Sequence, residues 1–98
     1  MRTSDITINQ SNNITSLDFS AFSSIQENDY LELNVNNISI KLNVNSNMSA
    51  NDFTEWLANN CNNNYDFYNI ATASNNDNVL SITSKTSDQL NIHYDFNR

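Results

Sequence analysis

Every tight turn of this chain has to form without glycine or proline, because its 98 residues contain neither. Glycine is the usual residue where the backbone needs a positive φ, and proline presets a common turn position. Asparagine tolerates the left-handed region better than most other residues. The chain has 22 asparagines, several of them between runs of alternating apolar residues. We therefore expect asparagine to occupy the positive-φ positions of the turns.

The clearest hairpin covers residues 30–44, with Asn36-Asn37 as a two-residue loop. The favoured form of this loop has positive φ at both residues. The loop sets an apolar register on one face, Val35 opposite Ile38, Leu33 opposite Ile40 and Leu31 opposite Leu42. On the other face it places Glu32 opposite Lys41. A shift of one residue would turn every apolar side chain to the wrong face, so the pattern predicts this register alone.

A single main helix is predicted at about residues 49–60. Ser49 is a suitable N-cap, and Asp52 follows three residues later near the positive end of the helix dipole. Phe53, Leu57 and Cys61 recur at helical spacing and form one apolar stripe. We expect the asparagine run 59–64 to end the helix, with asparagine in the left-handed position that glycine usually takes.

Three further segments complete the predicted fold. Residues 4–9 alternate through Ile6 and Ile8 as a short edge strand, and Thr15 is expected to cap a short helical turn. A second hairpin is expected over 65–84, with its loop at Ser74 to Asn78, and residues 89–96 form a closing strand. Together these segments predict a single α+β domain, 1–98, with the main helix packed on one face of a mainly antiparallel sheet.

The order of these motifs resembles a ββαββ module that occurs as an insert in bacterial flagellins and in bacteriophage tail and other virion proteins. The matching segments are Asp18-Phe19-Ser20, Asn28-Asp29, Val35-Asn36-Asn37, Ser49-Ala50-Asn51-Asp52 and Leu80 to Thr86, within about residues 17–86. Asn28 and Asn37 stand where the module has glycine. The chain also lacks the long helical flanks of flagellin. The resemblance implies a structural, surface-presenting module without catalytic residues.

Charge and composition disfavour several classes of function. The net charge is −7 and the four basic residues are dispersed, so we expect no nucleic-acid binding, which needs clustered lysine and arginine. No apolar stretch approaches the length of a membrane span, and no apolar leader begins the chain. The single cysteine cannot form an internal disulfide. We expect a protein made in a cytoplasm and kept there, or assembled there into a larger particle.

Two candidate chemical sites can be weighed against simpler interpretations. Cys61 could act as a nucleophile with His93 as its base, but the thiol lies on the predicted apolar stripe, where cysteine behaves as a buried hydrophobe. Residues 74–79 offer oxygen ligands for calcium, but Asp77 is the only carboxylate among them, so turn chemistry explains the segment better. We expect no enzyme activity, no metal and no cofactor.

Six apolar and aromatic residues form a candidate interface: Tyr65, Phe67, Tyr94, Phe96, Ile6 and Ile8. The aromatic residues could dock a partner protein, since aromatic side chains are enriched in interface cores. They could equally belong to a second covered layer of the core. The terminal strands that contain Ile6, Ile8, Tyr94 and Phe96 are also candidate edges for strand addition by a neighbouring subunit.

The function expected from these features is non-enzymatic. We expect a small bacteriophage virion component, associated with tail, neck or capsid, that assembles in multiple copies in the host cytoplasm. Its partners would be further copies or other particle proteins. One alternative is a small acidic phage-encoded inhibitor that binds the basic cleft of a host enzyme in the cytoplasm. A second alternative is a glycan-binding adhesin module.

Overall fold

The structure is a computed structural model that describes residues 6–98. These residues form seven strands and two helices: β1 (Thr7–Ser11), β2 (Ile14–Asp18), β3 (Tyr30–Val35), β4 (Ile38–Asn43), α1 (Ala50–Asn62), α2 (Tyr65–Ile70), β5 (Ala71–Asn76), β6 (Val79–Ser84) and β7 (Ile92–Asn97). The α+β class and the single main helix predicted from the sequence are confirmed.

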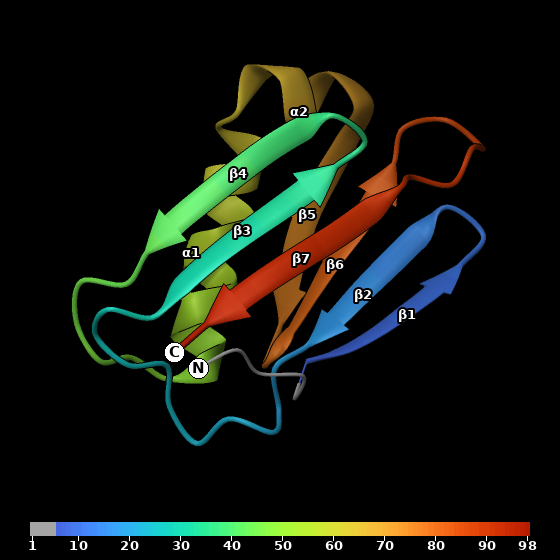
Figure 1. Cartoon of the computed structure of the whole chain (residues 1–98). Coiled ribbons are helices and arrows are strands. Elements are labelled where there is room, and N and C mark those ends of the chain that lie inside the picture. Colours follow the sequence, from blue (N-terminus) through green and yellow to red (C-terminus); the bar gives the residue numbers. More distant parts are fainter. Residues whose placement is uncertain (1–5) are drawn as a thin grey trace.

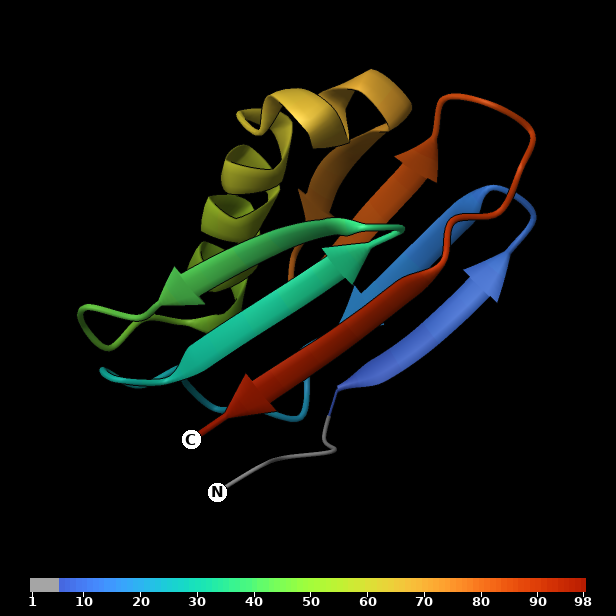
Figure 2. The same ribbon diagram turned by 45° about the horizontal axis from the view of Figure 1, so that its top comes forward.

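The strands divide between two antiparallel sheets, whereas the sequence predicts a single sheet. The first sheet has the order β1-β2-β6-β5, and the second has the order β4-β3-β7. The two sheets form two layers, and α1 runs beside β5 behind the three-stranded sheet (Figure 1). The same layers are visible after a 45° turn (Figure 2).

The core lies between the two sheets and against α1. Leu17 and Ile82 enter it from the four-stranded sheet, and Leu33 enters it from the three-stranded sheet; all three are fully buried. The rings of Phe19 and Phe53 meet edge to face with centroids 5.4 Å apart, a favoured aromatic geometry. Because one cluster joins both sheets and the helix, neither sheet has a core of its own.

Positive φ angles show which residues replace glycine. Within residues 6–98 they occur at Asn12, Asn28, Asn36 and Asp77, with φ of 54°, 74°, 57° and 54°. Asn12, Asn36 and Asp77 are each the first residue of a two-residue loop, between β1 and β2, β3 and β4, and β5 and β6. The substitution of asparagine for glycine is therefore confirmed at Asn36, but the positive φ predicted for Asn37 is wrong.

The hairpin β3–β4 has the register that the sequence predicts. Val35 pairs with Ile38, and the pairing continues along the strands to Tyr30 and Asn43, with Glu32 opposite Lys41. On the outward side, Ser39 Oγ donates a hydrogen bond of 2.6 Å to Asn34 Oδ1. The local turn and the alternation of the strands agree, so no alternative pairing competes.

Helix α1 begins as predicted and ends differently. The Ser49 side chain accepts a hydrogen bond of 3.0 Å from Asp52 N. At the other end the C-cap, Asn63, has φ −85° and ψ −7°, so the predicted left-handed asparagine is wrong. Asn64 instead caps a second helix, α2, by accepting a hydrogen bond from Phe67 N.

Two segments therefore have a different secondary structure from the prediction. Residues 65–70 are helical because the Asn64 cap starts a new turn there, and the second hairpin is shorter, with Asp77-Asn78 as its loop. Thr15 caps no helix. It lies buried in β2, because β2 pairs with β1 on one side and with β6 on the other. That long-range pairing overrides the local capping signal.

Candidate functional site

The structure does not bring Cys61 and His93 together. The Cys61 side chain is fully buried in the core, and this burial raises the pKa of its thiol to about 12. His93 is exposed on β7, between the buried Ile92 and the partly buried Tyr94, and so faces away from the core. A thiol held neutral in an apolar environment is a poor nucleophile.

The structure offers no cluster of ligands for calcium in the part of the chain that it describes. Residues 6–98 contain no group of three or more His, Cys, Asp or Glu side chains arranged to hold a metal ion. Asp77 has the positive φ of a hairpin loop, and its carbonyl oxygen accepts a hydrogen bond of 2.8 Å from Thr54 Oγ1. Within the same residues, no helix has the length and apolar character needed to cross a membrane.

The six candidate interface residues do not form one surface. Phe67, Phe96 and Ile6 are core residues, with 0, 0 and 4% of their surface exposed, so for the two phenylalanines the alternative of a covered layer agrees with the structure. Phe67 turns inward because its segment is the helix α2 rather than a strand. Tyr65 is exposed on α2, and Ile8 is exposed on β1. These two elements lie on different sides of the molecule in both views (Figures 1 and 2).

Tyr94 connects the two sheets. Its ring is partly buried, and its hydroxyl group donates a hydrogen bond of 3.1 Å to the carbonyl oxygen of Ile6. Gln10 Nε2 makes a second connection, donating to the carbonyl oxygen of Leu90 at 2.6 Å. These two bonds hold the β1 side of one sheet against the β7 side of the other.

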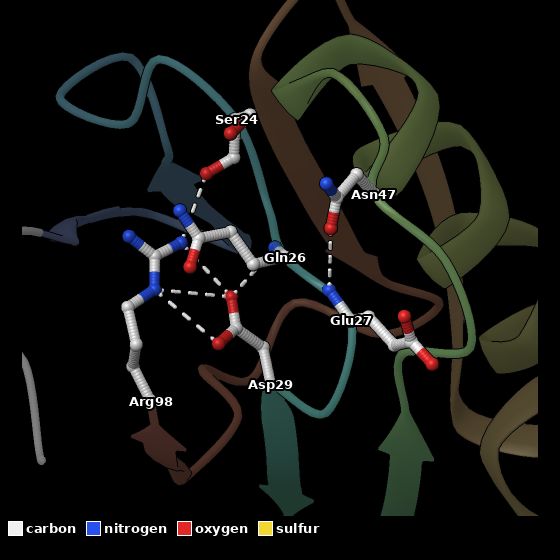
Figure 3. Close-up of polar contacts among 6 residues, drawn as sticks. All are labelled: Ser24, Gln26, Glu27, Asp29, Asn47 and Arg98. Carbon is white, nitrogen blue, oxygen red and sulfur yellow. Dashed lines mark hydrogen bonds and ion pairs between the residues drawn. The ribbon is translucent and has the colours of Figure 1, made fainter.

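A polar cluster around Asp29 fixes the loop before β3 to the end of β7 (Figure 3). Only 2% of Asp29 is exposed, and Arg98 Nη2 lies 2.9 Å from its Oδ2. The same carboxylate oxygen accepts a hydrogen bond from Gln26 N, and Arg98 Nη2 also donates to Ser24 O. A buried carboxylate needs such charged and hydrogen-bonding partners.

The Asp29 cluster joins two distant segments of the chain. Asn28 stands in the left-handed region directly before Asp29, and this turn directs the carboxylate toward Arg98. Alongside it, Asn47 Oδ1 accepts a hydrogen bond from Glu27 N at 2.8 Å (Figure 3). No local sequence pattern predicts the pair of Asp29 and Arg98, because 69 residues separate them.

The outward side of the four-stranded sheet is a candidate binding surface. Twelve residues of the four strands form this side, and none of the twelve is buried: Thr7, Asn9, Ser11, Ile14, Ser16, Asp18, Thr72, Ser74, Asn76, Val79, Ser81 and Thr83. We call this surface the hydroxyl face. Its middle row runs across all four strands as Asn9, Ser16, Ser81 and Ser74.

The outward side of the three-stranded sheet has a different chemistry. It comprises Tyr30, Glu32, Asn34, Ser39, Lys41, Asn43, His93, Asp95 and Asn97, and we call it the charged face. Its middle row places Asp95, Glu32 and Lys41 side by side. The hydroxyl face has a single charged residue, Asp18.

No protein-family model matches this chain, and no curated protein matches it.

Proposed function

We propose that the protein is a non-enzymatic structural component of a bacteriophage particle, associated with its tail, neck or capsid, that assembles in multiple copies. The observation that carries the proposal is the hydroxyl face. It extends over four paired strands and has one charged residue among its twelve positions, although the whole chain has a net charge of −7.

The composition of the hydroxyl face suits a protein contact. An ordinary surface with twelve outward positions would carry about three or four charged side chains. The cores of protein interfaces are depleted in charge. Serine, threonine and asparagine can exchange hydrogen bonds with a similar surface, directly or through water. A strongly acidic chain can pack against other copies most readily through a surface of this kind.

The order of elements also supports a particle component. The hairpin β3–β4, the helix α1 and the hairpin β5–β6 follow one another as in the ββαββ module that the sequence resembles. Asn28, which stands at a glycine position of that module, has the positive φ of 74° that glycine favours. The short helix α2 and the strand pair β1–β2 are additions to this order.

Sedimentation of the pure protein, together with negative-stain images of particle fractions, tests the proposal. Ser81→Lys places a charge in the central row of the hydroxyl face and should prevent assembly. Asn43→Lys places the same charge on the charged face and should leave assembly unchanged. A protein that remains a strict monomer at all concentrations and joins no particle fraction would overturn the proposal.

A second candidate function, inhibition of a host enzyme with a basic cleft, is favoured by one feature of the charged face. Glu32 and Asp95 lie directly opposite each other on β3 and β7. Like charges in this position destabilise a sheet, which suggests that the pair serves a partner. An inhibitor of this kind would bind a host protein as a monomer, and salt would weaken the complex steeply.

A further inference from the structure

Four strand edges border the two sheets, and one of them, that of β5, is covered by a helix. The Asn62 side chain of α1 accepts a hydrogen bond from Ala73 N and donates one to Ala73 O, each 2.8 Å long. This amide takes the place of a neighbouring strand. Thr54 and Asn51 of the same helix contact the far end of β5 and its loop. No strand can add at β5 without displacing α1.

Two more edges carry charge, which is a common protection against strand addition. Lys41 lies on β4, the outer strand of the three-stranded sheet, and Asp95 lies on β7 at its opposite edge. In addition, the hydrogen bonds of Tyr94 to Ile6 and of Gln10 to Leu90 tie the β7 side to the other sheet. Both edges of the three-stranded sheet therefore disfavour another strand.

Within residues 6–98, the fourth edge, β1, has neither a covering helix nor a charged residue, although Gln10 ties it to the other sheet. Its five residues, Thr7–Ser11, are all exposed and include no charged residue. Within residues 6–98, β1 pairs with β2 and with no other strand. Ile8 is 42% exposed in the middle of it. Alternate residues of an edge strand direct their backbone N–H and C=O groups away from the sheet, where they can pair with another strand.

We infer that β1 pairs antiparallel with β1 of a second copy, which joins the two four-stranded sheets into one continuous sheet. The inference rests on the proposed function and names the partner and the surface. A symmetric pairing centred on Asn9 sets Ile8 of each copy opposite Gln10 of the other and Thr7 opposite Ser11. The same five residues serve both copies, as a two-fold contact requires.

Charge makes a second copy a suitable occupant of this edge. Each molecule has a net charge of −7, so repulsion between two copies is smallest where neither presents a carboxylate, and the five residues of β1 include none. The joined sheets would also place the two hydroxyl faces side by side. This extends the sparsely charged surface on which the proposed particle contacts depend.

The contact between the two β1 strands is small, and its size determines how tightly we expect the dimer to form. Five residues on each side bury less than the ~1,000 Å² typical of a stable interface, so we expect a weak dimer that particle assembly reinforces. Salt should strengthen it, because the Debye length falls from about 30 Å at 0.01 M to about 8 Å at 0.15 M. An acidic inhibitor on a basic cleft would respond to salt in the opposite direction.

Cysteine cross-linking tests the pairing directly. Cys61 is buried, so a new surface cysteine is the reactive thiol of the folded protein. In the full chain, Asn9→Cys places two thiols opposite each other at the symmetry axis and should give a disulfide-linked dimer on mild oxidation. Ser16→Cys is the matched control. It is the partner of Asn9 in the same row, but its two copies would lie about 14 Å apart, three strand spacings, too far for a disulfide.

Two isoleucine substitutions separate the edge from the face. Ile8→Lys puts a charge on β1, and Ile14→Lys puts one on the hydroxyl face, where the isoleucine is similarly exposed, 45% against 42%. Combined with Asn9→Cys, Ile8→Lys should abolish the cross-link, and Ile14→Lys should preserve it. Circular dichroism checks that both variants are folded.

The outcomes distinguish the edge proposal from the proposed function. If the unsubstituted protein assembles but Asn9→Cys forms no more dimer than Ser16→Cys, pairing through β1 is overturned and assembly in multiple copies stands. The same follows if Ile8→Lys leaves the Asn9→Cys cross-link intact. If the unsubstituted protein is a monomer at every concentration and salt level, and joins no particle fraction, both proposals fail.

Discussion

The hydroxyl face and the charged face differ in their side chains, although inward and outward residues alternate in the same way along the strands of both sheets. Each sheet turns Leu, Ile or Val side chains into the shared core and leaves every second residue outside. On the three-stranded sheet the outward residues include Glu32, Lys41 and Asp95, but on the four-stranded sheet Asp18 alone is charged. The fold therefore does not determine the chemistry of the outward positions. They are free to serve contacts.

The largest predicted effect concerns the core that supports both faces. Phe53→Ala removes a fully buried ring that lies between Phe19 and Phe96, and we expect it to lower the free energy of unfolding by about 3–5 kcal/mol. Hydrogen exchange should show both sheets losing protection together. Loss of protection from one sheet alone would mean that the two sheets are separate folding units. It would contradict the claim that one core supports both faces.

The second effect contrasts a buried charge with those on the charged face. Arg98→Ala leaves the carboxylate of Asp29 buried without its ion pair, at an expected cost of about 3 kcal/mol. The midpoint temperature of thermal unfolding should fall by about 10–20 °C. Lys41→Ala on the exposed charged face should change stability by less than about 0.5 kcal/mol. Equal losses in the two variants would refute the view that the charged face contributes little to the fold.

The third effect appears at high pH. Burial raises the pKa of Cys61 from its ordinary value of 9.0 to about 12, so the folded state resists forming the thiolate. The unfolded chain loses this proton first, and stability therefore falls as the pH rises above 9. At pH 10 the loss should be at most about 1.4 kcal/mol. Cys61→Ala should flatten this alkaline limb in denaturant titrations, although it also removes buried volume.

Thiol labelling provides an independent check on Cys61. Because the side chain is fully buried, a thiol reagent should react at the rate of opening of the core, and added urea should accelerate the reaction. Fast labelling in native buffer would show that α1 opens without the sheets. In that case α1 would not belong to the cooperative core that joins the two sheets.

The sequence predicted the local parts of the fold. The β3–β4 register followed from residues 31–42, because a two-residue loop and the alternation of both strands agree. Ser49 was found as a cap for the same reason, since its partner Asp52 is three residues away. The class α+β follows once these elements are in order.

The parts that were not predicted depend on distant residues. Residues 14–18 look like the start of a helix until β6 supplies a strand partner more than 60 residues later. Residues 65–70 alternate like a strand, but Asn64 caps a helix there. The hydroxyl face needs four strands in register before its rows exist. The sequence does show serine, threonine or asparagine at nine of the twelve alternate positions of those strands.

The smallest predicted effect concerns Asp18, the one charged residue of the hydroxyl face. Its Oδ1 accepts a hydrogen bond of 2.8 Å from Ser20 N, and hydrogen bonding with Ser20 holds the pKa of Asp18 below its ordinary value of 3.8. A lowered folded-state pKa contributes stability that is present above pH 3.8 and is lost as the pH falls through the folded-state value. Asp18 is partly exposed on β2, and solvent screens the interaction, so the contribution is small.

Asp18→Asn therefore distinguishes the fold from the contact. It should change the acid limb of the stability curve only slightly, and stability at pH 7 should stay nearly constant. Assembly measured by sedimentation at 0.01 M salt should increase, because Asp18 is the only carboxylate on the hydroxyl face and unscreened repulsion is strongest at low salt. At 0.15 M salt the gain should shrink. If Asp95→Asn on the charged face raises assembly as much, net charge rather than the hydroxyl face governs association.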